Sequence, residues 1–128
     1  MHPFRAAVEA RDIDAAIALL ADDVVLRSPV VFRPYTGRAT VAPILRAVAE
    51  VFEDFEYVRE IGTPDASDHA LVFRARVGDR RLEGVDLLHT NDQGEIEELV
   101  AMIRPLNAAA ALAEAMAARL AEAGRLPA

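Results

Sequence analysis

Four stretches in the second half of the chain alternate apolar and polar residues with a period of two: 55–61 (FEYVREI), 71–77 (LVFRARV), 82–89 (LEGVDLLH) and 96–104 (IEELVAMIR). This alternation is typical of β-strands with one buried face. The segments between them are rich in turn-forming residues: 62–65 (GTPD), 78–79 (GD) and 91–94 (NDQG). Short turns of this kind join antiparallel neighbours. The region therefore predicts an antiparallel meander of four strands.

The first half of the chain shows helical spacing instead. Pro3 is placed in the first turn of a short helix that runs to residue 10, and Asp12 can cap a second short helix. Residues 24–28 predict a β-strand, and residues 29–38 predict an irregular loop. A longer helix begins at Thr40, where Pro43 is tolerated in the first turn. Its apolar residues repeat at helical spacing: Val41, Ile44, Leu45, Val48 and Phe52.

The end of the chain predicts one more helix, over about residues 107–123. Asn107 is a suitable cap and Gly124 a suitable stop. The alanine-rich sequence offers few large apolar groups, so this helix is expected to cover the core rather than build it. The sequence leaves two alternatives for this helix: it closes the mouth of the pocket, or it contacts a second subunit.

Together these elements predict one α+β domain over residues 1–128, with the helices on one face of a curved antiparallel sheet. The other face also carries apolar residues, such as Val85 and Leu87, and the last strand is apolar on both faces. Strands of this kind are usually buried on both sides. We therefore expect a homodimer through the outer sheet face, with a charged rim formed by Arg74, Arg76 and Arg104.

The composition bounds the function. The chain has 128 residues, 53% of them hydrophobic, and 14 basic against 21 acidic residues give a net charge of -7 without a basic run. Nucleic acid is therefore not an expected partner. There is no cysteine, and the three histidines lack ligand spacing, so no metal and no cofactor is expected. Residues 1–10 hold no apolar run of signal-peptide length, and no stretch is long and charge-free enough to span a bilayer, so the cytoplasm is the expected location.

Asp86 is the strongest candidate for chemistry. It shares strand parity with Leu82, Gly84 and Leu88, so its side chain is expected to point inward, where an apolar environment raises the pKa of a carboxyl group. Two roles are possible for Asp86. It contacts a ligand directly, or it is a structural acid that accepts hydrogen bonds from backbone amides, Tyr35 or Tyr57. The expected apolar ligand pocket is lined by Ser28, Tyr35, Phe52, Phe73, Ala75, Leu82, Gly84, Leu88, Leu99 and Ala101.

Several strings resemble the nuclear-transport-factor-two-like superfamily, in particular its SnoaL-like and ketosteroid-isomerase-like branch. They are 10–17 (ARDIDAAI), 20–24 (LADDV), Gly37-Arg38, 84–87 (GVDL) and 91–96 (NDQGEI), and the resemblance extends to about Pro105. It implies a cone-like α+β barrel, in which the sheet wraps the long helix around a pocket for a small apolar molecule. It also implies dimerisation through the sheet.

The resemblance to ketosteroid isomerases implies three functional positions. A tyrosine in the first helix falls on Phe4, an aspartate base at the end of the first strand falls on Ser28, and an aspartic acid on a later strand falls on Asp86. Phe4 cannot donate a hydrogen bond, and Ser28 lacks the histidine that would make it a base. Epoxide opening, which in relatives uses two carboxylates and an arginine, is also disfavoured, because only one carboxylate is expected inside.

Three hypotheses remain. The first is an isomerase or cyclase without a cofactor, in which Asp86 is the general acid or base on an enolisable ketone or polyketide-like molecule. SnoaL-like cyclases, whose ring closure is credited to one acidic residue, are the relatives that fit it. The second is a carrier or sensor of an apolar small molecule without catalysis. The third is a dimeric protein-interaction module with a small or filled cavity.

Overall fold

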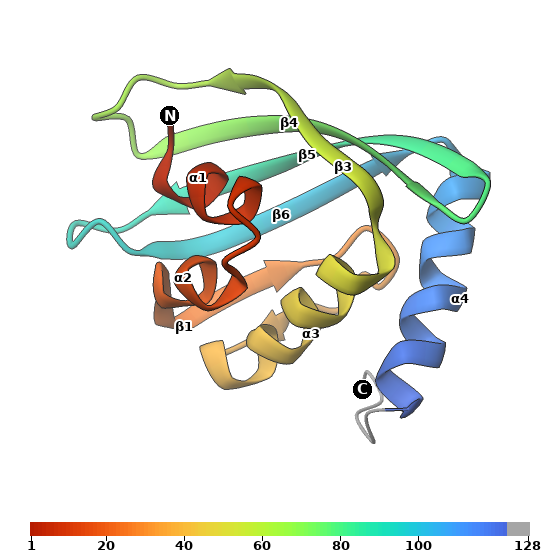
Figure 1. Cartoon of the computed structure of the whole chain (residues 1–128). Coiled ribbons are helices and arrows are strands. Elements are labelled where there is room, and N and C mark those ends of the chain that lie inside the picture. The colour runs from red at the N-terminus through yellow and green to blue at the C-terminus, as the bar shows by residue number, and fades with distance from the viewer. Residues whose placement is uncertain (123–128) are drawn as a thin grey trace.

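Across residues 1–122, which this computed structural model describes, a curved, unclosed six-stranded sheet carries its helices on one side (Figure 1). The strand order is β2-β1-β6-β5-β4-β3. The strands are β1 (Leu20–Arg27), β2 (Tyr35–Thr36), β3 (Glu53–Ile61), β4 (Asp68–Val77), β5 (Arg80–Thr90) and β6 (Ile96–Arg104). The helices are α1 (Pro3–Glu9), α2 (Ile13–Ala18), α3 (Arg38–Val51) and α4 (Leu106–Glu122). The predicted α+β class and cone-like architecture are confirmed.

The predicted four-strand meander is confirmed, because β3, β4, β5 and β6 pair in sequence order and antiparallel. The first strand begins earlier than expected, at Leu20, and runs parallel to β6, which makes the sheet mixed. The expected irregular loop also contains a short strand, since Tyr35 and Thr36 pair with Leu26 and Val25. Such a two-residue strand is too short to produce a periodic signal in the sequence.

The helix starts follow local hydrogen bonds. Asp12 caps α2 as predicted, because its Oδ1 accepts from the backbone N–H of Ala15 at 3.1 Å. The expected start of the long helix was wrong by two residues. Gly37, with φ at 95°, turns the chain so that α3 begins at Arg38, and Pro43 consequently lies inside the helix rather than in its first turn. Glycine adopts this backbone region without strain.

Helix α4 begins one residue before the expected cap and lies against its own chain. Its residues Leu112, Met116 and Leu120 form a buried cluster with Ala47 of α3. The predicted stop at Gly124 lies outside the described residues. Among residues 1–122, no helix combines the length and the apolarity needed to cross a bilayer.

The core lies between the concave side of the sheet and the helices, and Phe73 on β4 is at its centre. The Phe73 ring lies 5.0 Å from that of Phe55 and 5.8 Å from that of Phe52, between ring centroids. It also crosses Gly84 on β5, where an added Cβ would lie 2.3 Å from Phe73 Cζ. Gly84 is therefore the residue that lets this ring reach the sheet.

Candidate active site

A cavity of about 810 Å³ lies between the concave face of the sheet and α3. Its lining is mostly apolar and extends from Phe4 and Val8 of α1 to Met116 and Leu120 of α4. Figure 1 places these two helices at opposite ends of the sheet, so the cavity runs along the strands. Charged side chains also line it, outside the apolar interior: Glu9, Arg11, Arg46, Glu50 and Glu56.

Asp86 contributes a carboxyl group to this cavity from the middle of β5. It is paired across the sheet with Leu71 of β4 and Ala101 of β6. The Tyr57 hydroxyl, from the edge strand β3, donates a hydrogen bond to Asp86 Oδ2 at 3.1 Å. Of the two tyrosines named as possible partners from the sequence, Tyr57 is therefore the one that reaches Asp86. The second carboxyl oxygen has no protein donor among the described residues and remains available to a ligand.

The surroundings of Asp86 favour its neutral form. Burial raises the pKa of Asp86 to about 7, and the hydrogen bond from Tyr57 opposes part of this rise. Burial, together with the nearby Asp86 carboxylate, raises the pKa of Tyr57, so its hydroxyl stays protonated as a donor. Near neutral pH Asp86 is thus divided between acid and carboxylate, which are the two forms that proton transfer requires.

The structure brings together part of the expected lining and separates the rest. Besides Asp86, the cavity surface includes Ser28, Tyr35, Phe52, Phe73, Leu99 and Ala101. Four residues expected there are absent from it: Ala75, Leu82, Gly84 and Leu88. Strand parity predicted the face correctly but says nothing about depth. Leu88 is packed into the core at 1% exposure, and the ring of Phe73 covers Gly84.

Ala75 and Leu82 lie toward the β4–β5 turn. There they border a second depression of about 600 Å³, which is lined mainly by charged residues of the sheet. This depression includes Arg74, Arg76 and Arg104, which confirms that these arginines lie away from the apolar cavity.

The two positions that replace the polar residues of ketosteroid isomerases have structural explanations. Phe4 is buried at 4% exposure and forms part of the apolar wall. Ser28 Oγ accepts hydrogen bonds from the backbone N–H groups of Val30 and Val31, at 3.0 and 3.1 Å, and so closes the turn after β1. Asp86 is therefore the carboxyl group that Tyr57 reaches. Among the described residues, the apolar part of the cavity lining holds no second carboxylate.

Sequence reasoning missed the contribution of the helices to the cavity. The α3 residues Ile44, Leu45 and Val48 were recognised as an apolar helix face, and they line the cavity as well as packing against the core. Helix α4 adds Ala113, Met116, Ala117 and Leu120. The periodicity of these helices was visible, but it indicates only that a face is apolar, not whether a space is left beneath it.

Comparison with known proteins agrees with this architecture. The family model described as the SnoaL-like domain matches residues 2–99. The chain belongs to the SnoaL-like domain family. This SnoaL-like fold is similar to a solved steroid delta-isomerase from Pseudomonas aeruginosa, with a TM-score of 0.87 and 40% identity, over 92% of this chain and 86% of that one. A comparison with curated proteins finds none that matches.

Two further solved structures mark the breadth of the SnoaL-like relatives. An uncharacterised bacterial protein with a cystatin-like fold from Silicibacter pomeroyi DSS-3 shares 37% identity, with a TM-score of 0.87 over 94% of this chain and 87% of that one. A putative ketosteroid isomerase from Kribbella flavida DSM 17836 shares 25% identity, with a TM-score of 0.64 over 80% and 73%. The suspected branch of the superfamily is thereby confirmed.

Proposed function

We propose that this SnoaL-like protein is an isomerase or cyclase that acts, without a cofactor, on an enolisable ketone or polyketide-like small molecule through Asp86. The observation that carries the proposal is a single carboxyl group, with a pKa of about 7, set in an apolar cavity of about 810 Å³. A volume of this size falls in the range of small-molecule sites. The charged side chains of the lining are exposed, so the apolar body of a ligand contacts the apolar cavity wall.

The proton transfer follows from the two forms of Asp86. As a carboxylate, it removes a proton from the carbon next to the ketone, and the C–H electrons move onto the carbonyl oxygen to give an enolate. In an isomerisation, the resulting carboxylic acid returns this proton to a different carbon of the conjugated enolate. In a ring closure, the enolate carbon attacks a second carbonyl, and Asp86 protonates the alkoxide formed there. Tyr57 holds the carboxyl group in place throughout.

The relative named as a steroid delta-isomerase supports isomerisation as the reaction type. Phe4 and Ser28 nevertheless argue against the familiar division of labour between a tyrosine, a base and an acid. In this chain Asp86 must both remove and return the proton. A reaction in which one group shuttles one proton meets this requirement, because the same carboxyl group ends each cycle in its starting form.

A carrier or sensor of an apolar molecule is the second candidate, and the replacement of two polar positions by Phe4 and Ser28 favours it. Binding without conversion needs only the apolar cavity and one hydrogen-bonding group. The carrier predicts a bound molecule that is recovered unchanged, whereas the enzyme predicts exchange or migration of a proton next to its carbonyl.

Ligand stabilisation tests the site shared by both candidates. We expect rigid phenols and enones to raise the unfolding temperature of the wild type. At a ligand concentration one hundred times the Kd, binding adds about 2.7 kcal/mol to the free energy of unfolding. Asp86→Asn should lose most of this effect, because the phenol hydroxyl donates a charge-assisted hydrogen bond to the carboxylate, which the asparagine amide oxygen accepts more weakly. The exposed substitution Asp92→Asn is the matched control and should behave as the wild type. Equal stabilisation of both variants would remove Asp86 from the site.

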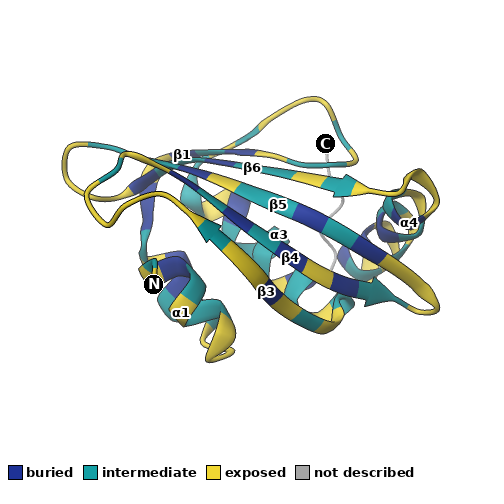
Figure 2. Cartoon of the chain, turned by 90° about the horizontal axis from the view of Figure 1, so that it is seen from above, coloured by how far each residue is buried: buried dark blue, intermediate teal, exposed yellow. Residues whose placement is uncertain are grey.

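The outer face of the sheet carries the second part of the proposal, a homodimer. The strand register arranges this face in rows (Figure 2). Two apolar rows lie in the middle, Val72/Val85/Met102 and Ala70/Leu87/Val100. The rows at one end, Glu53/Arg76/Arg81 and Glu56/Arg74/Glu83/Arg104, hold four arginines and three glutamates, and the row Asp68/His89/Glu98 lies at the other end.

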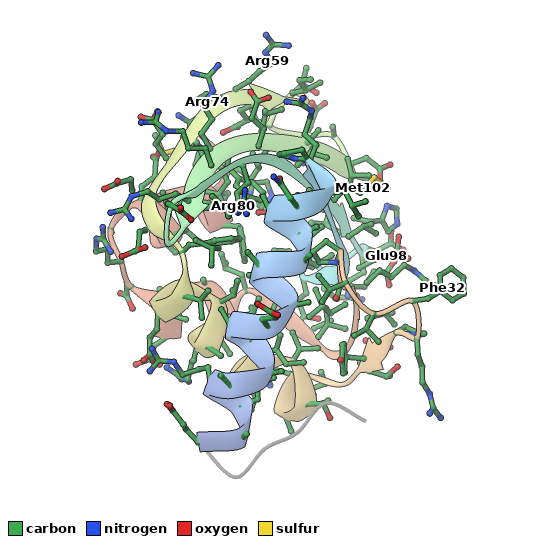
Figure 3. All side chains as sticks on the ribbon, turned by 90° about the vertical axis from the view of Figure 1, so that its right-hand side faces the viewer. Phe32, Arg59, Arg74, Arg80, Glu98 and Met102 are labelled. Atoms are coloured by element: carbon green, nitrogen blue, oxygen red, sulfur yellow. The ribbon has the colours of Figure 1, made fainter. Side chains whose placement is uncertain are left out.

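This distribution of charge fits a second copy of the chain. In the dimer, a two-fold axis lies between the two sheets and runs parallel to the apolar rows. Rotation by 180° about this axis places the arginine end of one copy on the acidic end of the other. Figure 3 shows Arg59 and Arg74 projecting from the outer side of the sheet, away from the helices, and Met102 and Glu98 further along its curve. Met102 is 54% exposed and Leu87 38% exposed in the single chain. We infer that these two residues are buried in the dimer.

Sedimentation experiments test this interface. We expect the wild type to sediment as a dimer at micromolar concentration and Met102→Glu to sediment as a monomer, because the substitution buries an unpaired charge in the apolar rows. Ala6→Glu, at an exposed position of α1 on the helix side of the sheet, should remain dimeric. High salt should weaken the dimer by screening the ion pairs at its two ends. A monomeric wild type would contradict the proposal.

A further inference from the structure

Helix α4 forms one end of the cavity, and it lies outside the part of the chain that matches the family model, residues 2–99. The apolar residues of the helix form two adjacent stripes, one of large side chains and one of alanines. Leu112, Met116 and Leu120, spaced by four residues, are buried against α3. Met116 and Leu120 also reach the cavity surface, and beside them Ala113 and Ala117 line it with methyl groups only. The larger side chains therefore fix the helix in place, and the small ones leave space beside it.

The position of α4 is determined by this chain itself. Ile103 of β6 and Val77 of β4 belong to an apolar group that packs against the buried α4 side chains, which are Leu112, Met116 and Leu120. An ion pair adds to these contacts, since Arg119 Nη1 lies 2.7 Å from Glu50 Oε2 of α3. In Figure 3 the helix stands in front of the end of the sheet. This end of the cavity is therefore bounded by a helix of the same chain.

A direct apolar path leads from Asp86 to this wall. Asp86 is paired with Ala101 on β6, and Ile103 follows two residues later on the same face, roughly 7 Å along the strand at the usual rise. Ile103 lines the cavity and also packs with the α4 cluster. A ligand held at Asp86 by an oxygen atom can thus extend its apolar part along β6 until it meets α4.

We propose that α4 is the specificity element of the site, in which Ala113 and Ala117 set how long an apolar ligand the cavity accepts beyond Asp86. This inference rests on the proposed function for the position of the polar end of the ligand. It specifies the substrate class further: an elongated molecule with one enolisable carbonyl at the Asp86 end and an unbranched or flat apolar extension toward α4.

A series of 4-alkylphenols, from phenol to 4-octylphenol, separates the two ends of the site. The hydroxyl group reports on Asp86 and the alkyl chain on α4. We expect the affinity of the wild type, measured by isothermal titration calorimetry, to rise about fourfold per added methylene until the chain reaches the wall. Ala113→Leu fills the space at the wall, so long-chain members should bind at least tenfold more weakly, and phenol itself within twofold of wild type.

The matched control is Ala118→Leu, the same substitution on an exposed position of the same helix that does not line the cavity. It should retain the wild-type dependence on chain length. Ala117→Leu serves as a second test variant, because Ala117 is exposed and tolerates a larger side chain without repacking the core. It should shorten the accepted chain as Ala113→Leu does.

The outcomes distinguish this inference from the proposed function. If both leucine variants keep the wild-type dependence on chain length while Asp86→Asn weakens phenol binding, the role of α4 is wrong and that of Asp86 stands. If the leucine variants exclude long chains but Asp86→Asn binds phenol normally, the wall is supported and the proposed role of Asp86 is wrong. A wild type that binds no member of the series overturns both.

Discussion

Asp86→Asn is expected to slow the enolisation of a bound ketone by about 10²- to 10⁴-fold, the range that a positioned general base contributes. Asparagine has nearly the same size and can still accept the hydrogen bond from Tyr57, so the cavity keeps its form. It cannot take up a proton at neutral pH. The loss should therefore fall on turnover, while apolar contacts and folding are preserved.

The rate can be measured without knowing the natural substrate. Cyclic β,γ-unsaturated ketones in heavy water report removal of the α-proton as deuterium incorporation, and its return elsewhere as migration of the double bond, both visible by NMR. The wild-type rate should increase with pH through about 7, as Asp86 becomes a carboxylate. A wild type that binds these ketones but neither exchanges nor isomerises them would favour the carrier over the enzyme.

Tyr57→Phe provides a control that keeps the carboxyl group. It removes the hydrogen bond that lowers the pKa of Asp86, so the rising limb of the pH profile should move to higher pH. A smaller rate at all pH values with an unmoved limb would show that Tyr57 acts by some route other than the pKa of Asp86.

The second large effect concerns stability. Folding raises the pKa of Asp86 from 3.8 to about 7, so between these values the folded state binds a proton that the unfolded chain has released. The stabilisation linked to this proton is fully present below pH 4 and is lost as the pH rises through about 7. The asparagine side chain of the Asp86→Asn variant does not titrate, so its contribution to stability stays constant over this range.

The sign of the difference between the two proteins follows directly. At pH 4 we expect Asp86→Asn and the wild type to unfold with similar free energies. At pH 8 the variant should be more stable by about 2–4 kcal/mol, because the wild type then holds a charged carboxylate against the apolar cavity. The lower end of this range applies where water in the cavity solvates the charge. Other titrating groups are common to both proteins and cancel in the difference.

Urea unfolding at a series of pH values measures this difference. Ligand-free protein is needed throughout, since a bound phenol would stabilise the wild type by mass action. A difference that stays flat between pH 4 and 8 would mean that Asp86 titrates near its ordinary pKa, and its role as a base matched to neutral pH would lose its physical support.

The direction of a side chain and its depth in the fold are encoded differently in this chain. The period of two in β5 placed Asp86 on the concave face, and the same parity put Leu82, Gly84 and Leu88 beside it. Only Asp86 of these four reaches the cavity. Parity distinguishes the two faces of a strand, whereas the cavity also depends on what lies above each residue, and the ring of Phe73 covers Gly84.

The sequence by itself determined the antiparallel meander, the short N-terminal helices, and a carboxyl group on the inner face of the sheet, because these depend on period, capping and turn residues that act over a few positions. The tertiary structure decided that β1 runs parallel to β6, that Tyr57 rather than Tyr35 holds Asp86, and that α4 lines one end of the cavity. These features join residues far apart in the chain. Their pairing depends on the curvature of the sheet and on how side chains of different size pack against it, and no local pattern encodes either.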